Sequence, residues 1–154
     1  MKINIGLSAK DLKTSIDVLS TILSDEMVLY TKTRKFHWNV SGNSFMELHK
    51  LFENNYSGLE VIIDNVAERI NQLGGKTIGT MKEMLELTNL KEAPNVYPNQ
   101  MEMIAELLSD NEQVIAILRD GVDKCEKDIG TADFLTGLVQ EHEKTAWILR
   151  RYLN

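Results

Sequence analysis

Apolar residues recur every three or four positions along most of the chain, a period that is typical of amphipathic helices. The first such stretch runs from Ser8 to about Phe36 and places its apolar side chains at Leu12, Ile16, Leu19, Leu23, Met27 and Tyr30. Ser8 and Asp11 resemble a capping box, in which side chains at the start of a helix bond its free backbone amides. The pattern therefore predicts a long first helix that begins close to Ser8.

A second long helix is expected after the loop at residues 39–43. Ser44 and Glu47 again have the spacing of a capping box, the apolar period continues to Leu73, and Gly74-Gly75 is a typical helix end. Residues 76–98 contain both prolines of the chain and one short helical phrase at 81–85. This segment is predicted to be a long crossover that holds one or two helical turns.

Two further helices follow the crossover. Asn99 and Glu102 form a third capping pattern, ahead of apolar positions at Ile104, Leu107, Leu108, Ile115, Leu118 and Val122. Gly130-Thr131 interrupts the period, and a fourth helix is expected to follow, with Phe134, Leu135, Leu138, Val139, Ala146, Leu149 and Leu153. Long helices on both sides of a long crossover describe the ferritin-like form of the four-helix bundle. Residues 1–154 are therefore predicted to be a single all-α domain.

Composition narrows the setting of this domain. The first residues lack the apolar stretch of a signal peptide, and no run approaches the roughly 20 apolar residues of a membrane span. The single cysteine, Cys125, cannot form an internal disulfide and suits a reducing compartment, so a cytoplasmic location is expected. The formal net charge of −6 opposes non-specific attraction to nucleic acid.

The candidate chemistry lies on the second helix and the turn before it. His49 and Glu53 are four residues apart, as are Asp64 and Glu68, so each pair shares one face of the helix. The eleven residues from Glu53 to Asp64 make about three helical turns, which places both pairs on one stripe. His37, at the end of the first helix, can join the first pair. These five side chains are the candidate metal ligands.

A single straight helix cannot bring the two pairs to one metal ion, because His49 and Glu68 lie about 28 Å apart along its axis. Their spacing is symmetric, however. The midpoint between His49 and Glu68 in the sequence lies beside Gly58, and the midpoint between Glu53 and Asp64 is the same point. Two copies of this helix could cross antiparallel, with close backbone approach at Gly58. His49 and Glu53 of one copy would then meet Asp64 and Glu68 of the other, and the symmetry would form this contact twice. The sequence thus predicts a metal site shared across a two-fold dimer.

Imidazole and carboxylate donors together suit divalent first-row metals, and iron, manganese and zinc are all compatible with them. Carboxylates bind both ferrous and ferric ions, which favours iron redox chemistry over a closed structural zinc site. The chain has no Glu-x-x-His motif, which a di-iron site inside one bundle would use. Two other classes stay open: a redox-silent zinc or manganese buffer, and a non-enzymatic structural or DNA-associated cage.

Several stretches match one known family closely. They are His37-Trp38-Asn39-Val40, Gly42, Phe45, Leu48, His49, Phe52, Tyr56, Asp64, Ala67-Glu68-Arg69, Leu73-Gly74, Thr131-Ala132-Asp133, His142-Glu143-Lys144-Thr145-Ala146-Trp147 and Leu149-Arg150. In these stretches, which span nearly its whole length, the chain resembles the Dps family, the DNA-binding proteins from starved cells. The resemblance implies a hollow dodecamer that binds ferrous iron at its two-fold interfaces. It also implies a ferroxidase that oxidises this iron, preferably with hydrogen peroxide, and stores a ferric mineral, which protects against oxidative stress.

The resemblance also implies roles for single residues. The ferroxidase ligands would be His37, His49 and Glu53 of one subunit with Asp64 and Glu68 of its partner, and Glu53 stands where many members carry aspartate. Trp38 would take up oxidising equivalents beside the site, or pack between subunits. Iron would enter through acidic channels near the junction of the last two helices, where Asp133 and then Asp128 are the best candidates. Asp133 would otherwise be a charge that favours the helix dipole.

DNA binding is where the chain departs from the name of this family. Members that bind DNA directly tend to use a lysine-rich N-terminal extension, whereas only Lys2 precedes the first helix here. The C-terminal Arg150-Arg151 is basic but too short to act as a tail. With the acidic net charge, direct DNA binding is expected to be weak or absent at physiological salt.

Overall fold

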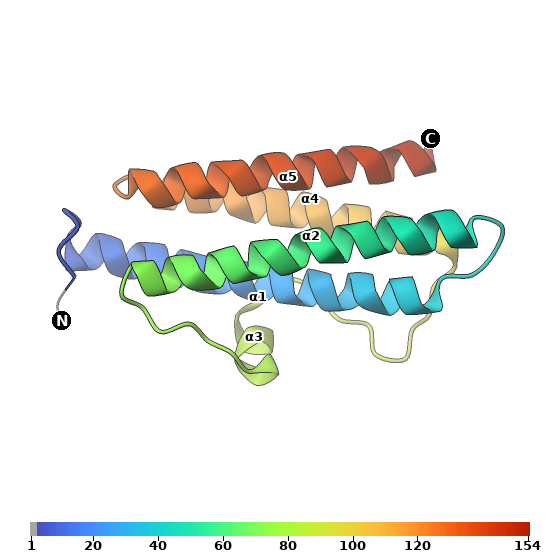
Figure 1. Cartoon of the computed structure of the whole chain (residues 1–154), viewed down its shortest axis with the longest axis horizontal. Coiled ribbons are helices and arrows are strands. Elements are labelled where there is room, and N and C mark those ends of the chain that lie inside the picture. The colour runs from blue at the N-terminus through green and yellow to red at the C-terminus, as the bar shows by residue number, and fades with distance from the viewer. Residues whose placement is uncertain (1–2) are drawn as a thin grey trace.

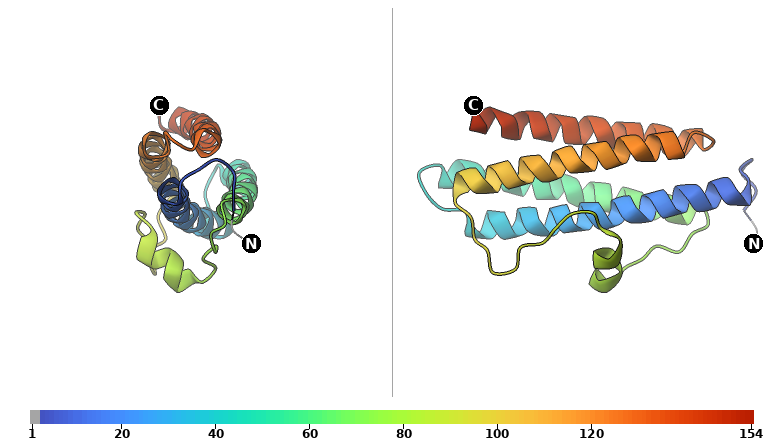
Figure 2. Two further views of the ribbon diagram at one scale, coloured as in Figure 1. Left: turned by 90° about the vertical axis from the view of Figure 1, so that its left-hand side faces the viewer. Right: turned by 180° about the vertical axis from the view of Figure 1, so that it is seen from behind.

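The computed structural model describes residues 3–154, so Lys2 lies outside the described residues (Figure 1). The described residues form five helices: α1 (Ala9–Asn39), α2 (Phe45–Gln72), α3 (Met81–Leu87), α4 (Gln100–Lys124) and α5 (Ile129–Leu153). Seen along its axis, the molecule is a bundle of the four long helices, with α3 outside it in the crossover (Figure 2). The predicted all-α bundle with a short crossover helix is confirmed.

The core consists of the apolar stripes of the long helices. α1 packs along α2, α4 packs along α5, and α1 also contacts α4. Burying one aliphatic side chain in such a core contributes roughly 1.5–3 kcal/mol. The side chains with almost no exposure include many positions that the helical period selects: Leu19, Leu23, Ile104, Leu107, Leu118, Leu135 and Leu149. No helix within residues 3–154 is long and apolar enough to span a membrane.

Two of the three predicted helix starts have the expected caps. The Ser8 hydroxyl accepts a hydrogen bond from the Asp11 amide at 3.1 Å, and α1 begins at Ala9, directly after Ser8. Asn99 and Glu102 form a reciprocal box, because the Asn99 carboxamide accepts from the Glu102 amide while the Glu102 carboxylate accepts from the Asn99 amide. These side chains satisfy backbone amides that have no partner within the helix.

The box expected at Ser44 and Glu47 is wrong. Ser44 has φ −100° and ψ 24° instead of the extended backbone of a capping residue, and its side chain makes no capping bond. The first amide of α2 is satisfied by backbone instead, since the Phe45 amide donates to the Gly42 carbonyl at 3.1 Å. The start of α2 at Phe45 still agrees with the apolar period.

The break expected at Gly130-Thr131 is also wrong, because α5 already begins at Ile129 and both residues lie in its first turn. Asp128 is the N-cap, and its carboxylate accepts from the Thr131 amide at 3.1 Å and from the Thr131 hydroxyl at 2.6 Å. These two bonds stabilise the first helical turn, so a glycine inside it is tolerated.

The crossover is attached to α1 through a buried carboxylate. Asp25 is 1% exposed, and its oxygens accept from the Asn89 amide at 2.6 Å and from the Thr88 hydroxyl at 2.7 Å. Further along, the Lys35 ammonium donates to the Ala93 carbonyl at 2.8 Å. These contacts fix the crossover against the outer side of α1, which leaves the other faces of the bundle uncovered by it (Figure 2).

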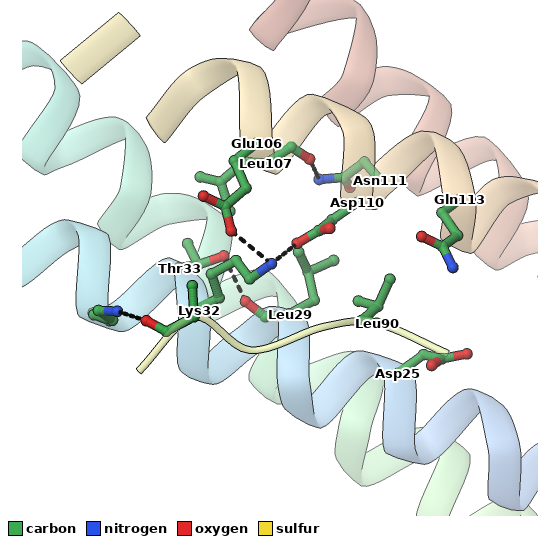
Figure 3. Close-up of polar contacts among 12 residues, drawn as sticks. Asp25, Leu29, Lys32, Thr33, Leu90, Glu106, Leu107, Asp110, Asn111 and Gln113 are labelled. Carbon is green, nitrogen blue, oxygen red and sulfur yellow. Dashed lines mark hydrogen bonds and ion pairs between the residues drawn. The ribbon is translucent and has the colours of Figure 1, made fainter. Parts of the chain in front are cut away.

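A buried ion cluster joins α1 to α4 (Figure 3). The Lys32 ammonium, on a residue 8% exposed, lies 2.6 Å from an Asp110 oxygen and 2.9 Å from a Glu106 oxygen. Charges removed from water need close partners, and the three groups supply them to one another. The cluster therefore couples the first pair of helices to the second.

Candidate metal centre

The end of α1 and the start of α2 bring two histidines together. The rings of His37 and His49 stack with their centroids 3.7 Å apart and their planes 20° from parallel. The Nδ1 atom of each ring lies 2.8 Å from the backbone carbonyl oxygen of the other residue. A carbonyl only accepts hydrogen bonds, so each Nδ1 carries a proton, and a neutral ring then has its lone pair on Nε2. This is the tautomer that a metal-binding imidazole requires, with the second nitrogen bound to a backbone carbonyl.

The turn between the helices makes this pairing possible. The Val40 amide donates to the Phe36 carbonyl at the end of α1, and the Phe45 amide donates to the Gly42 carbonyl at the start of α2. Gly42 has φ +111°, a conformation that residues with a Cβ rarely adopt. The buried side chain of Leu48 then anchors the first turn of α2 in the core. The histidines thus protrude from backbone that is fixed on both sides.

Glu53 lies one turn beyond His49 on the same face of α2, but its carboxylate is engaged elsewhere. It accepts from the Lys50 ammonium at 2.8 Å. The pKa of Glu53 is lowered, mainly by this hydrogen bond and the charge of Lys50 and further by His37 and His49. The lowered pKa keeps this carboxylate ionised at neutral pH. The ion pair is exposed to solvent, and exposed pairs exchange readily.

The remaining two predicted ligands lie apart from the first three. Asp64 and Glu68 are exposed on α2, and Asp64 is about 16 Å beyond Glu53 along the helix axis. Asp64 lines a groove between α1 and α2 together with Met27, Tyr30, Glu60, Val61, Ile63 and Ala67. Within residues 3–154 no three His, Cys, Asp or Glu side chains are grouped closely enough to hold a metal ion. The five predicted ligands therefore form two separate groups, His37 with His49 and Glu53, and Asp64 with Glu68, and no complete metal site within the described residues of one subunit.

Gly58, beside the centre of the symmetric spacing, is exposed on α2. It lines a cavity of about 410 Å³ between α2 and α5, which we call the α2–α5 groove and which Asn55, Asn65, Asn111, Glu141 and His142 also line. Glu60 and Asp64 line the groove between α1 and α2 instead. Gly58 and Asp64 therefore line different grooves, and the expected close approach of two copies at Gly58 stays a prediction.

Aromatic side chains surround His37, and among them lies Arg34, which the sequence analysis did not single out. Tyr56 lies edge-on to the His37 ring at 5.2 Å between centroids. The Arg34 guanidinium lies 4.7 Å from the Tyr56 ring, 5.5 Å from the Tyr30 ring and 5.4 Å from the Trp38 ring. Trp38 is 65% exposed. A four-residue spacing links Tyr30 to Arg34 and Arg34 to Trp38, and this spacing was the available signal.

The two predicted pore aspartates have different settings. Asp128 is 3% exposed, and Arg69 adds a contact of 3.4 Å to its two bonds with Thr131. Burial alone raises the pKa of Asp128, but the hydrogen bonds and the charge of Arg69 outweigh it, so its pKa is lowered. Asp133 is exposed on the first turns of α5. Within one subunit, Asp128 therefore acts as a helix cap, whereas Asp133 is exposed, and the role of either in a channel stays a prediction.

Comparisons with known proteins agree with this fold. Residues 16–154 match the model of the ferritin-like domain. The chain is 40% identical to DNA protection during starvation protein 2 of Bacillus anthracis, over 92% of this chain and 98% of that protein. It is 45% identical to a low temperature-induced protein of Nostoc, over 99% and 87%. The structure superposes on a Dps protein of Vibrio cholerae with a TM-score of 0.93 at 28% identity, over 100% of this chain and 98% of that one.

The bundle and the ferritin-like match define a protein of the ferritin-like class, whose broad superfamily includes diiron-carboxylate proteins. Within that class, the starvation-protein relatives and the Dps structures place the chain more narrowly. The chain belongs to the Dps family, the mini-ferritins. The family resemblance of the sequence is thereby confirmed.

Proposed function

We propose that this protein oxidises ferrous iron and stores the ferric product. The observation that carries the proposal is the stacked pair of His37 and His49, in which each Nδ1 is bonded to the backbone carbonyl of the other residue and each Nε2 is left for a metal ion. Glu53, whose pKa is lowered, lies one turn further along α2. A purely structural turn has no need for two imidazoles held in this tautomer. Neutral imidazole and carboxylate donors match the ligand preference of ferrous iron, the proposed substrate.

The site is completed by a second copy of the chain. Asp64 and Glu68 of the partner would meet His37, His49 and Glu53 across a two-fold axis, and the reverse contacts would form a second site. This arrangement accounts for the two half-sites that one subunit carries too far apart to use together. The Dps structures that the chain resembles suggest the wider assembly, a hollow dodecamer.

Hydrogen peroxide is the proposed oxidant. One peroxide takes one electron from each of two ferrous ions, its O–O bond breaks, and two protons complete two water molecules. Because peroxide receives both electrons at one site, it does not release the hydroxyl radical that its one-electron reduction by a single ferrous ion would produce. The protein binds both ions through its imidazoles and carboxylates, and Trp38 is proposed to take up oxidising equivalents that escape the site. The result protects the cell from oxidative stress.

The remaining functional predictions follow from this role. Asp133, with Asp128 second, is the proposed lining of the channel that admits iron. The protein is expected to act in the cytoplasm and to bind DNA weakly or not at all, since the chain has a net charge of −6. The starvation-protein relative is named for protecting DNA, and removal of iron and peroxide would achieve this without contact. Tight retardation of DNA on a gel at about 0.15 M salt would contradict the expectation.

Stopped-flow absorbance tests the oxidation directly. Anaerobic protein loaded with ferrous iron is mixed with hydrogen peroxide or with oxygen, and the rise of ferric absorbance is recorded. The wild type is expected to oxidise iron much faster than buffer does, and faster with peroxide. A His49→Ala variant is expected to lose the fast phase, because it lacks one of the two locked imidazoles.

A matched control separates loss of a ligand from loss of charge. Asp64→Asn and Glu60→Gln each remove one carboxylate charge from the exposed side of α2, one helical turn apart. Only Asp64→Asn is expected to abolish the fast phase. Equal loss in both variants would point to general electrostatic attraction of iron, and no fast phase in the wild type would refute the ferroxidase. Calorimetry with zinc would then show whether the protein is a metal buffer or a structural cage.

A further inference from the structure

Three polar side chains from three helices meet inside the bundle, away from the proposed iron site. His142 of α5 is 3% exposed, and its Nε2 atom lies 2.8 Å from Oε1 of Glu26 on α1. Its Nδ1 atom lies 2.9 Å from Oδ1 of Asn111 on α4. Neither the fold nor the proposed oxidation of iron requires a titratable pair at this place.

The hydrogen on Nδ1 can be assigned from the surroundings of Asn111. The amide nitrogen of Asn111 donates to the Leu107 carbonyl at 2.7 Å, which fixes the orientation of the carboxamide (Figure 3). The oxygen of Asn111 therefore faces His142 and can only accept. Nδ1 of His142 must carry a proton, which it donates to Asn111.

A second proton must lie between His142 and Glu26. Nε2 without a hydrogen and a bare carboxylate oxygen are both acceptors, and they would repel each other at 2.8 Å. The pair is therefore either an imidazolium with a carboxylate or an imidazole with a carboxylic acid. In both forms the pair is neutral as a whole and holds one proton more than the separate neutral imidazole and carboxylate would.

Burial makes the loss of this proton costly. Glu26 is fully buried, and its Oε2 atom has no hydrogen-bond partner among the described residues. Removing the shared proton would leave a bare carboxylate in the core with no opposite charge. Burial alone lowers the pKa of His142, but the charge and hydrogen bond of Glu26, with the charge of Glu141, outweigh it and raise that pKa.

The other helices add no competing positive charge. The α2 side chains that line the α2–α5 groove are uncharged, including Asn55 and Asn65. On α4, Asp110 is turned toward Lys32 and Asn111 is neutral. The groove reaches His142 and Glu141, so it provides a path by which the pair can exchange its proton with solvent.

We propose that His142 and Glu26 form a proton-operated lock that holds α5 against α1 and α4. With the proton present, the pair and Asn111 connect the three helices. When it is lost, the core holds an unpaired carboxylate and α5 loosens. Because the pKa of His142 is raised on folding, this stabilisation is complete below the ordinary pKa of histidine and is lost as the pH rises through the raised value.

Deuterium exchange at the imidazole C2 position, read by mass spectrometry, measures the titration of each histidine in the intact assembly. His142 is expected to titrate at higher pH than a histidine in an unfolded peptide of this protein. Glu26→Gln is expected to lower the titration midpoint of His142. The matched variant Glu141→Gln, at an exposed neighbouring position, is expected to leave that midpoint close to its wild-type value. A midpoint of wild-type His142 at or below that of the unfolded peptide would overturn the lock.

Backbone deuterium exchange of residues 135–149 tests whether loss of the proton loosens α5. After correction for the intrinsic effect of pH, α5 of the wild type is expected to exchange severalfold faster above the His142 midpoint than below it. In Glu26→Gln the rate is expected to be independent of pH, because no buried charge develops. If wild-type α5 exchanges equally on both sides of the midpoint, the proton is held without locking the helix and the proposal fails.

Discussion

A site shared between two subunits can be tested by complementation of two inactive variants. His37→Ala and Asp64→Ala each remove one proposed ligand, and symmetry removes it from every site of the assembly. Each variant alone is therefore expected to lose rapid oxidation of iron. The two substitutions lie in different halves of the site, which one chain cannot bring to a common metal ion.

The size of the recovery follows from the geometry of the pair. In a mixed dimer, one site contains both alanines and is inactive. The second site contains the native His37 of one chain and the native Asp64 of its partner, so it is intact. A mixed dimer thus regains one site of two, and random pairing of equal amounts makes half of the dimers mixed. The fast phase should return with about one quarter of the wild-type amplitude.

The assay needs both variants in one assembly. Coexpression supplies this, intact-mass measurement gives the ratio of the chains, and the amplitude of the fast phase in stopped-flow absorbance counts the active sites. His37→Ala mixed with His49→Ala is the control, because both substitutions affect the same half and every site still lacks one ligand. Equal recovery in both mixtures, or none in the first, would refute a site shared in this way.

Three further predictions concern the contacts that hold the subunit together. Lys32→Met leaves the buried carboxylate of Asp110 without its cation, so the free energy of unfolding in guanidinium should fall by about 3 kcal/mol; an unchanged midpoint would contradict this. Asp25→Ala removes the acceptor of the Asn89 amide, which should cost about 2 kcal/mol and speed deuterium exchange at residues 88–90. Asp128→Asn should lower the melting temperature near neutral pH, and the difference should shrink on acidification. The pKa of Asp128 is lowered, so its stabilisation is present above the ordinary aspartate pKa and lost as the pH falls through the folded value. A difference that is constant with pH would refute it.

Most of the fold could be predicted from the sequence because each long helix buries a continuous apolar stripe. Such a stripe determines both the helical period and the face that packs, as Leu19 and Leu118 illustrate. The errors lie at helix ends, where one or two hydrogen bonds decide. Asp128 caps α5 two residues before the glycine that seemed to interrupt it, and Ser44 has a backbone conformation that its sequence context does not reveal.

The candidate site could be predicted in part, for a geometric reason. Helical spacing places His49 and Glu53 on one face, but it carries no information about contacts across a turn. The stacking of His37 on His49, and the carbonyls that fix their tautomers, depend on the path of the backbone through residues 40–44. Symmetry in residue number does not show which side of α2 a residue occupies: Gly58 lines the groove toward α5, and Asp64 lines the groove toward α1. His142 appeared only as part of a motif, since its partners Glu26 and Asn111 are distant in sequence.

The division of the proposed site between two chains ties iron binding to assembly. The histidine half is already ordered within one subunit, so its imidazoles lose little freedom when a metal ion binds. The carboxylate half lies on the same helix but too far away, so the proposed site would be complete only where two subunits meet. A ligand that binds the dimer better than the monomer must stabilise the dimer by the same linkage. Iron would therefore stabilise the subunit interface at which it is oxidised. A subunit that fails to assemble would bind iron too weakly to oxidise it at an incomplete site.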